Sequence, residues 1–245
     1  MTPPVSLDPV DSSTPPPVPA AQPVSPPASS APAPAASSAP TPFNPRIIDR
    51  LHLVIGGGYN TGTQVAIDAD AYRNAAPSYR GGMFLLQPSY SVFLNRNFDI
   101  RIGGDLRYSS LSVEPRAGRA DSSIGALSLG GMLEGAWLPH QHFGIGLNLA
   151  LGYMGLMSSN ADVGAPVTAT LDFGREGGFF LGVQPFVTFL NQVVRVGVSI
   201  DTMPGGFRMD TGAGNPPVAT SVRPMITPFI GIDGMEIIAW ATRGN

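Results

Sequence analysis

The residues that could do chemistry in this chain are few, and most are charged residues on alternate positions of short apolar segments. Alternation with a period of two gives each segment one apolar and one polar face. Charges that share an enclosed face should pair, because burying a lone charge is costly. Two interpretations stay open: a salt-bridged plug, or a gated, narrow ion path lined by the same arginines. The predicted interior charges are Arg101, Asp105, Arg107, Glu134, Arg195, Asp201 and, at the start of the last segment, Arg223.

The three histidines are the candidates for metal binding or base catalysis. His140 and His142 flank a predicted tight turn, with no carboxylate or third histidine nearby in sequence, so we expect exposed turn residues. His52 could act as a base, as in lipid-modifying barrel enzymes, but spacing assigns it no serine and acid partners. The run Gly56–Gly58 lacks the Lys-Ser/Thr of a phosphate loop. We therefore expect no catalytic, metal or cofactor site and no enzyme activity.

The composition narrows the class of protein further. The chain has 245 residues with 14 basic side chains, all arginine, and 17 acidic ones, and only 13% of it is charged. A water-facing surface needs roughly 25–35% charged residues. The absence of cysteine excludes disulfides and thiolate sites. Weakly acidic charge without basic runs argues against nucleic acid as a partner.

Proline separates two regions of the chain. Fifteen of the 26 prolines fall within residues 1–45, where Asp8 and Asp11 are the only charges. Such a segment cannot bury enough apolar surface to fold, so we expect an extended, disordered tether over 1–45 and one domain over 46–245. The start Met1-Thr2-Pro3-Pro4 has neither the basic nor the apolar part of a signal peptide, so we expect a mature or truncated form.

Residues after Ile47 predict strands. From Phe143 to Tyr153, large apolar residues alternate with Gly, Asn and Ala, a pattern that a strand sorts by face and a helix does not. The same test predicts eight strands, joined alternately by tight turns and by long loops over 62–81, 112–123, 157–177 and 203–223. Asp233-Gly234 could close a hairpin or form a bulge, so whether 233–245 continue the last strand stays open. The predicted strands are 50–61, 82–94, 98–111, 124–138, 142–156, 178–190, 193–202 and 224–241.

The chain also repeats part of itself. The residues Gly81-Gly82-Met83-Phe84, Gln87-Pro88 and Phe93-Leu94-Asn95 resemble Gly177-Gly178-Phe179-Phe180, Gln184-Pro185 and Phe189-Leu190-Asn191, with an offset of 96 residues at both ends. The repeat is too long for a solenoid, and it predicts related hairpins in two four-stranded halves of one domain.

The polar faces decide between a soluble barrel and a membrane barrel. They consist mainly of Gly, Ala, Ser, Asn and Gln, which suit a crowded interior better than a soluble exterior. Aromatic residues cluster at both ends of the strands, as amphipathic rings do at a bilayer interface. The predicted girdle at the short-turn end is Phe93, Phe98, Trp137, Phe143, Phe189 and Trp240, and that at the long-loop end is Tyr59, Tyr79, Tyr108, Tyr153 and Phe179.

On these features the chain resembles small bacterial outer-membrane β-barrels of the kind represented by the outer membrane protein A barrel, over residues 46–245. The resemblance rests on strand count, loop alternation, girdles and glycine-rich inner faces, and no sequence motif identifies a subfamily. Such barrels usually end in an aromatic residue, whereas Trp240 is followed by five more residues. The resemblance implies an all-β, eight-stranded antiparallel up-and-down transmembrane barrel in the bacterial outer membrane.

The expected function is structural. We expect an anchoring or partner-binding protein that contacts membrane lipid and reaches cell-wall or other envelope partners through residues 1–45 or the long loops. A narrow pore for ions or small solutes is the alternative, and a lipid-active barrel enzyme is the third.

Overall fold

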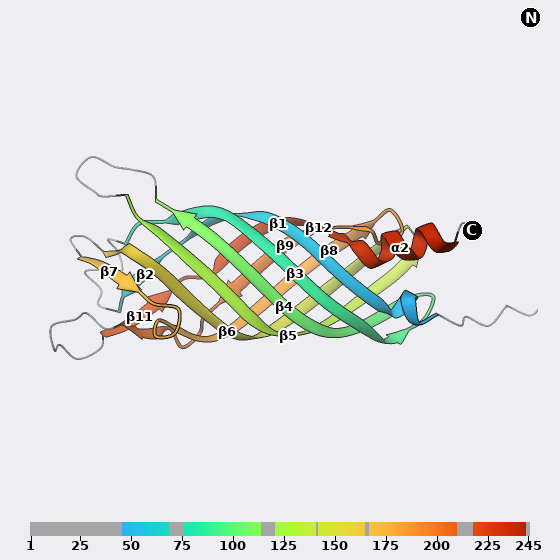
Figure 1. Cartoon of the computed structure of the whole chain (residues 1–245), viewed down its shortest axis with the longest axis horizontal. Coiled ribbons are helices and arrows are strands. Elements are labelled where there is room, and N and C mark those ends of the chain that lie inside the picture. The colour runs from blue at the N-terminus through green and yellow to red at the C-terminus, as the bar shows by residue number, and fades with distance from the viewer. Residues whose placement is uncertain are drawn as a thin grey trace, which may run out of the picture. The chain divides into compact units, whose positions relative to one another are not determined.

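The computed structural model describes residues 46–68, 76–113, 121–140, 142–164, 167–209 and 218–243. The predicted tether over 1–45 lies outside the described residues. Eight antiparallel strands pair in the order β5-β4-β3-β1-β12-β9-β8-β6, and β6 pairs again with β5, which closes a barrel (Figure 1). The predicted fold class is confirmed. The strands are β1 (Leu51–Thr63), β3 (Tyr79–Leu94), β4 (Phe98–Ser112), β5 (Ser123–His140), β6 (Phe143–Gly164), β8 (Gly177–Phe189), β9 (Val194–Thr202) and β12 (Met225–Asp233).

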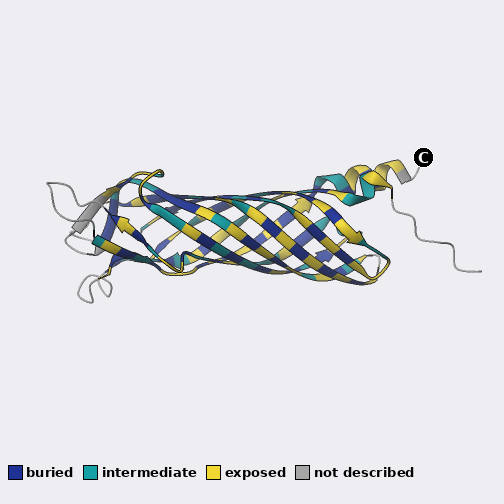
Figure 2. Ribbon diagram, turned by 90° about the horizontal axis from the view of Figure 1, so that it is seen from below, coloured by how far each residue is buried: buried dark blue, intermediate teal, exposed yellow. Residues whose placement is uncertain are grey.

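Burial alternates along the strands with the period that the sequence predicts. In β12 every second residue from Met225 to Asp233 is buried and the others are exposed. Figure 2 shows the same alternation as bands of buried and exposed residues around the wall. The inward glycines let the wall coil tightly. A Cβ added to Gly130 or to its partner Gly152 would overlap the backbone of the facing strand, so this crossing requires glycine on both sides.

The last predicted strand is wrong beyond Asp233. The chain turns there into helix α2 (Gly234–Arg243). The carboxylate of Asp233 accepts the backbone N–H of Met235 at 3.1 Å and that of Glu236 at 3.4 Å, which is the contact of a helix N-cap. Asp233-Gly234 is therefore a helix start, neither a hairpin nor a bulge. A short 3₁₀ helix, η1 (Ile47–Arg50), precedes β1 and contacts α2.

The predicted long loops contain further strands. The loop 62–81 contains β2 (Val65–Ile67), and the loop 203–223 contains β10 (Phe207–Met209) and β11 (Val218–Val222). These three strands form a separate sheet in the order β10-β11-β2. A fourth strand, β7 (Val167–Leu171), pairs with the outer part of β6. Three of the four predicted loops are therefore only partly irregular, because these segments pair beyond the barrel proper.

No helix among the described residues is long and apolar enough to cross a membrane.

Candidate functional site

A group of buried ions fills the barrel near its tight turns. The Nε of Arg101 lies 2.6 Å from Oδ2 of Asp99, and its Nη1 lies 3.3 Å from Oε1 of Glu134. Arg195 donates two bonds to the same Glu134, at 2.6 and 2.8 Å, and its guanidinium lies 4.0 Å from the centre of the Phe186 ring. Arginine pairs with two parallel bonds are strong and fix their partners in place. These ions form a rigid, mutually neutralised layer.

His52 belongs to the same layer. Its Nδ1 lies 2.9 Å from Oδ2 of Asp233, and its Nε2 lies 3.0 Å from Oγ of Ser91. The Ser91 hydroxyl donates to Asp99 at 2.6 Å, so its oxygen can accept from His52. Both ring nitrogens therefore lie within hydrogen-bond distance of side-chain oxygens.

Asp233 joins this layer to the end of the barrel wall. Its Oδ2 binds His52, while its Oδ1 accepts the backbone N–H of Leu53 on β1 and caps α2. Glu236, in the first turn of α2, is also buried, with Oε1 3.7 Å from the His52 ring. Helix α2 is thus held against the interior ions by its own first turn.

A second polar layer surrounds Arg107 in the middle of the barrel. The Nε of Arg107 lies 2.8 Å from Oδ2 of Asp105, and Nη1 binds both Asp201 and, at 2.8 Å, the Ser199 hydroxyl. Gly182 faces this group, and a Cβ there would lie 2.7 Å from Nη1 of Arg107 and 2.9 Å from Oδ1 of Asp201. The arginine occupies the space that the missing side chain leaves.

The two copies of the sequence repeat meet in this layer. Gln87 of β3 donates to Gln184 of β8 at 2.8 Å and to Asp105 at 2.5 Å, and Asn148 donates to Gln184 at 3.1 Å. Strands β3 and β8 are four places apart in the eight-strand order and so lie opposite each other. The repeated glutamines therefore bridge the interior from opposite walls.

Toward the long-loop end the interior becomes apolar. Side chains of the barrel strands, among them Met154 and Phe180, pack in one cluster with Val65, Phe207 and Met209 of the small sheet. Tyr79 is 0% exposed in this cluster, so its predicted place in the outer girdle is wrong. Its hydroxyl binds Ser122 at 2.5 Å and accepts the N–H of Asp162 at 2.6 Å, which explains why an aromatic residue with a polar tip fits inside.

The outer face of the barrel is an apolar belt. Leucines and isoleucines on several of the barrel strands are exposed along it, such as Leu133, Leu151 and Ile230. The other predicted girdle residues lie on the outer face of the strands, where Phe98 pairs with Trp137 and Phe143 with Phe189 across strands. Trp240 is 63% exposed but lies on α2, so its predicted place at the end of a strand is wrong. The strand girdles are Phe93, Phe98, Trp137, Phe143 and Phe189 at the tight turns, and Tyr59, Tyr108, Tyr153 and Phe179 at the other end.

Arg223 is the one predicted interior charge that the structure places elsewhere. It lies between β11 and β12 and is exposed, since β12 begins two residues later and the alternation does not extend back to it. The other six predicted charges are buried inside the barrel. His140 and His142 are exposed at the β5–β6 turn, and the described residues contain no group of three or more potential metal ligands.

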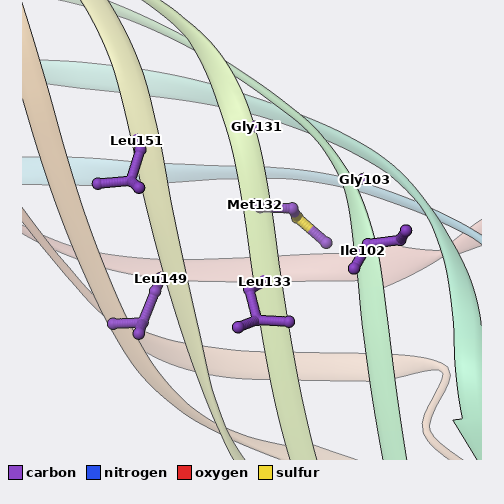
Figure 3. A pocket seen from close by; sticks show the side chains of 7 residues that line it. All are labelled: Ile102, Gly103, Gly131, Met132, Leu133, Leu149 and Leu151. Carbon is purple, nitrogen blue, oxygen red and sulfur yellow. The ribbon is translucent and has the colours of Figure 1, made fainter.

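Two depressions mark the outside of the described barrel. One, of about 680 Å³, is an apolar hollow over β4, β5 and β6 (Figure 3). It forms at Gly131, which has no side chain, and is bordered by the exposed side chains of Ile102, Leu133, Leu149 and Leu151. Its place in the apolar belt suits a hydrocarbon chain. The other, of about 510 Å³, lies at the long-loop end between β11 and the β9–β10 connection and includes Asp68 and Arg223.

Several interior residues were not among those that the sequence predicts. Asp99 has the same parity as Arg101 and could have been found by extending the alternation two residues back. Ser91 and Asp233 likewise have the inward parity of their strands, whereas Glu236, on α2, carried no such signal. The pairing of His52 with Asp233 could not be found from alternation, because it spans 181 residues and depends on closure of the barrel.

Comparisons with known proteins add similarities to bacterial outer-membrane proteins. No protein-family profile and no curated protein sequence matches the chain. Among solved structures, the chain is similar to Ail, the attachment invasion locus protein of Yersinia pestis (12% identity, 75% of this chain and 99% of that one, TM-score 0.41). It is also similar to OprG of Pseudomonas aeruginosa (12%, 74% and 95%, 0.40) and to the toluene transporter TodX of Pseudomonas putida (11%, 76% and 67%, 0.23).

The identification of the protein class rests on the barrel itself. Its backbone polar groups are paired around a closed sheet, its outer face is apolar, and aromatic residues border that face at both ends. A bilayer admits a sheet only in this closed form. The chain is an integral membrane β-barrel with the architecture of small outer-membrane barrels.

Proposed function

We propose that this protein has a structural, anchoring or partner-binding role and conducts no ions or solutes. The observation that carries the proposal is the filled interior. Two layers of paired ions and amides lie below an apolar cluster, so a solute would have to displace buried charge pairs and then packed side chains. Partners would then bind at the long-loop end or to residues 1–45.

Planar bilayers test the absence of conduction. The full chain should give no steady conductance, because both interior layers are closed by direct side-chain contacts. The Gly182→Ala variant is a useful comparison, since it disturbs the Arg107 layer without removing a charge. Steady channels in the wild-type protein that change in size or ion selectivity with Arg195→Ala would instead favour the narrow pore.

The absence of enzyme activity is part of the same proposal. Ser91, His52 and Asp233 follow the order of a serine nucleophile, base and acid. Ser91 is fully buried, however, and its hydroxyl donates to Asp99, whereas a nucleophile must reach substrate and give its proton to the histidine. We expect no labelling of Ser91 by a fluorophosphonate, with Ser91→Ala as the control. Labelling that is lost in Ser91→Ala would overturn this part of the proposal.

The anchoring role can be tested through residues 1–45. We expect the full chain in detergent to sediment with purified cell-wall peptidoglycan and a variant lacking residues 2–45 to stay in the supernatant. Equal sedimentation of the two would remove the N-terminal segment from the proposal and leave the long-loop end as the contact surface.

A further inference from the structure

Helix α2 presents an apolar face outward at the short-turn end of the barrel. Ile237, Ile238 and Trp240 are all exposed, at 44%, 48% and 63%, while Glu236 and Ala239 are buried on the other side. Glu236 is the only charged residue between Met235 and Thr242, and it points toward His52. The outward face of α2 over these positions therefore carries no charge.

This face continues the apolar belt of the barrel. Ile232, the last outward residue of β12, is exposed, and so are Leu51 and Ile55 of β1, the strand that α2 contacts. Figures 1 and 2 both show α2 at the tight-turn end of the barrel, pointing away from the strands. Exposed apolar residues thus lie both on the ends of these strands and on the helix that follows them.

The helix is also held in a fixed place. Asp233 caps it, Glu236 reaches the buried ion layer and Ala239 is 1% exposed against the rest of the molecule. A helix of 10 residues is too short to be stable by itself in water. Its conformation comes from the barrel, so its apolar face is ordered before it meets any partner.

We propose that α2 is a membrane-interface anchor whose outward face binds phospholipid of the periplasmic leaflet, with Trp240 at headgroup level. With eight strands, both ends of the barrel lie on the short-turn side, which is periplasmic in this class of protein. Tryptophan favours the bilayer interface, and an apolar helix face beside charged headgroups is typical of interfacial helices. Lipid is the occupant that the adjoining belt indicates, because the exposed apolar side chains of β1 and β12 beside α2 would themselves face lipid in a membrane barrel.

Spin labelling of the full chain in phosphatidylethanolamine and phosphatidylglycerol vesicles tests the proposal. The chain has no cysteine, so Ile238→Cys carries a single nitroxide. Matched controls are Ile230→Cys in the middle of the belt and Arg96→Cys in the exposed β3–β4 turn at the same end. We expect the ratio of oxygen to water-soluble nickel accessibility at 238 to lie near that at 230 and well above that at 96.

Three outcomes would contradict it in different ways. A ratio at 238 equal to that at 96 means that α2 faces water. Spin–spin broadening at 238 that disappears on dilution with unlabelled protein means that a second copy of the chain covers it. A water-like ratio at 230 as well would overturn the membrane barrel on which the proposed function rests, and not the anchor alone.

Fluorescence gives a second measurement that needs no label. Trp137→Phe leaves Trp240 as the only tryptophan, and Trp240→Phe leaves Trp137 on the strand girdle as the control. We expect Trp240 emission to be quenched by lipid brominated near the headgroup and little affected by iodide in the buffer. Quenching of Trp240 by iodide without quenching by brominated lipid would overturn the proposal.

Discussion

The two ends of the barrel interior are filled in different ways, although the same strands build both. Near the tight turns, Arg101, Arg195 and His52 are paired with carboxylates, whereas near the long loops Met154 and Phe180 pack against apolar side chains. Burying ions stabilises little in total but makes each partner indispensable, since removal of one leaves a buried charge unpaired. Apolar packing stabilises in proportion to the surface and volume that it fills. The free energy of unfolding should therefore depend on charge at the tight-turn end and on side-chain volume at the long-loop end.

The largest effect should follow from Glu134→Ala. This change removes the shared partner of Arg101 and Arg195 and should lower the free energy of unfolding by about 3–5 kcal/mol. Urea unfolding in vesicles measures it, and Glu134→Gln, which keeps one carbonyl acceptor and the volume, should lose less. A loss in Glu134→Ala with no loss in Glu134→Gln would mean that volume, not charge, matters at this end.

Met154→Ala should have a somewhat smaller effect, of about 3 kcal/mol, through the cavity that it leaves in the apolar cluster. The isosteric control is Met154→Leu, which keeps most of the volume and should cost less than about 1.5 kcal/mol. The same unfolding assay applies. If Met154→Leu were as damaging as Met154→Ala, the apolar end would depend on the thioether and the comparison would fail.

Gly182→Ala probes the boundary between the two ends and should cost about 1–3 kcal/mol, the range for overpacking. Its Cβ would press on Arg107 and Asp201, so one of them must shift. Gly135→Ala is the matched control, because a Cβ there meets nothing within 4 Å. Equal stability of the two variants would show that Arg107 or Asp201 can shift to admit the added Cβ at little cost in free energy.

The comparison also shows what the sequence could and could not predict. Alternation alone predicts the strands, the closed barrel and the burial of Arg101, Arg107 and Glu134, because inward and outward environments differ sharply. It fails where a boundary depends on a contact distant in the chain. Asp233 starts a helix because Leu53 and His52, about 180 residues earlier, hold its carboxylate in place.

The local pattern also misplaced residues whose type suits two environments. Tyr79 is of a residue type that is common in girdles, but it lies inside the barrel, because its hydroxyl forms hydrogen bonds with Ser122 and Asp162 there. Trp240 suits an interface and is exposed, but on a helix. An aromatic residue near the end of a strand predicts proximity to the bilayer surface better than it predicts whether its side chain faces into or out of the barrel.

The junction between the first and last strands has a consequence for how the barrel opens. Strands β1 and β12 share five registered pairs, Val54–Gly58 with Asp233–Phe229, whereas β4 and β5 share fifteen. Fewer ladder bonds make this seam the shortest route to local unfolding, and its tight-turn end is held by the contacts of Asp233 with His52 and Leu53. Amide hydrogen exchange should therefore be fastest along β12 among the eight strands, and the ion pair at its end should determine how often the wall separates there.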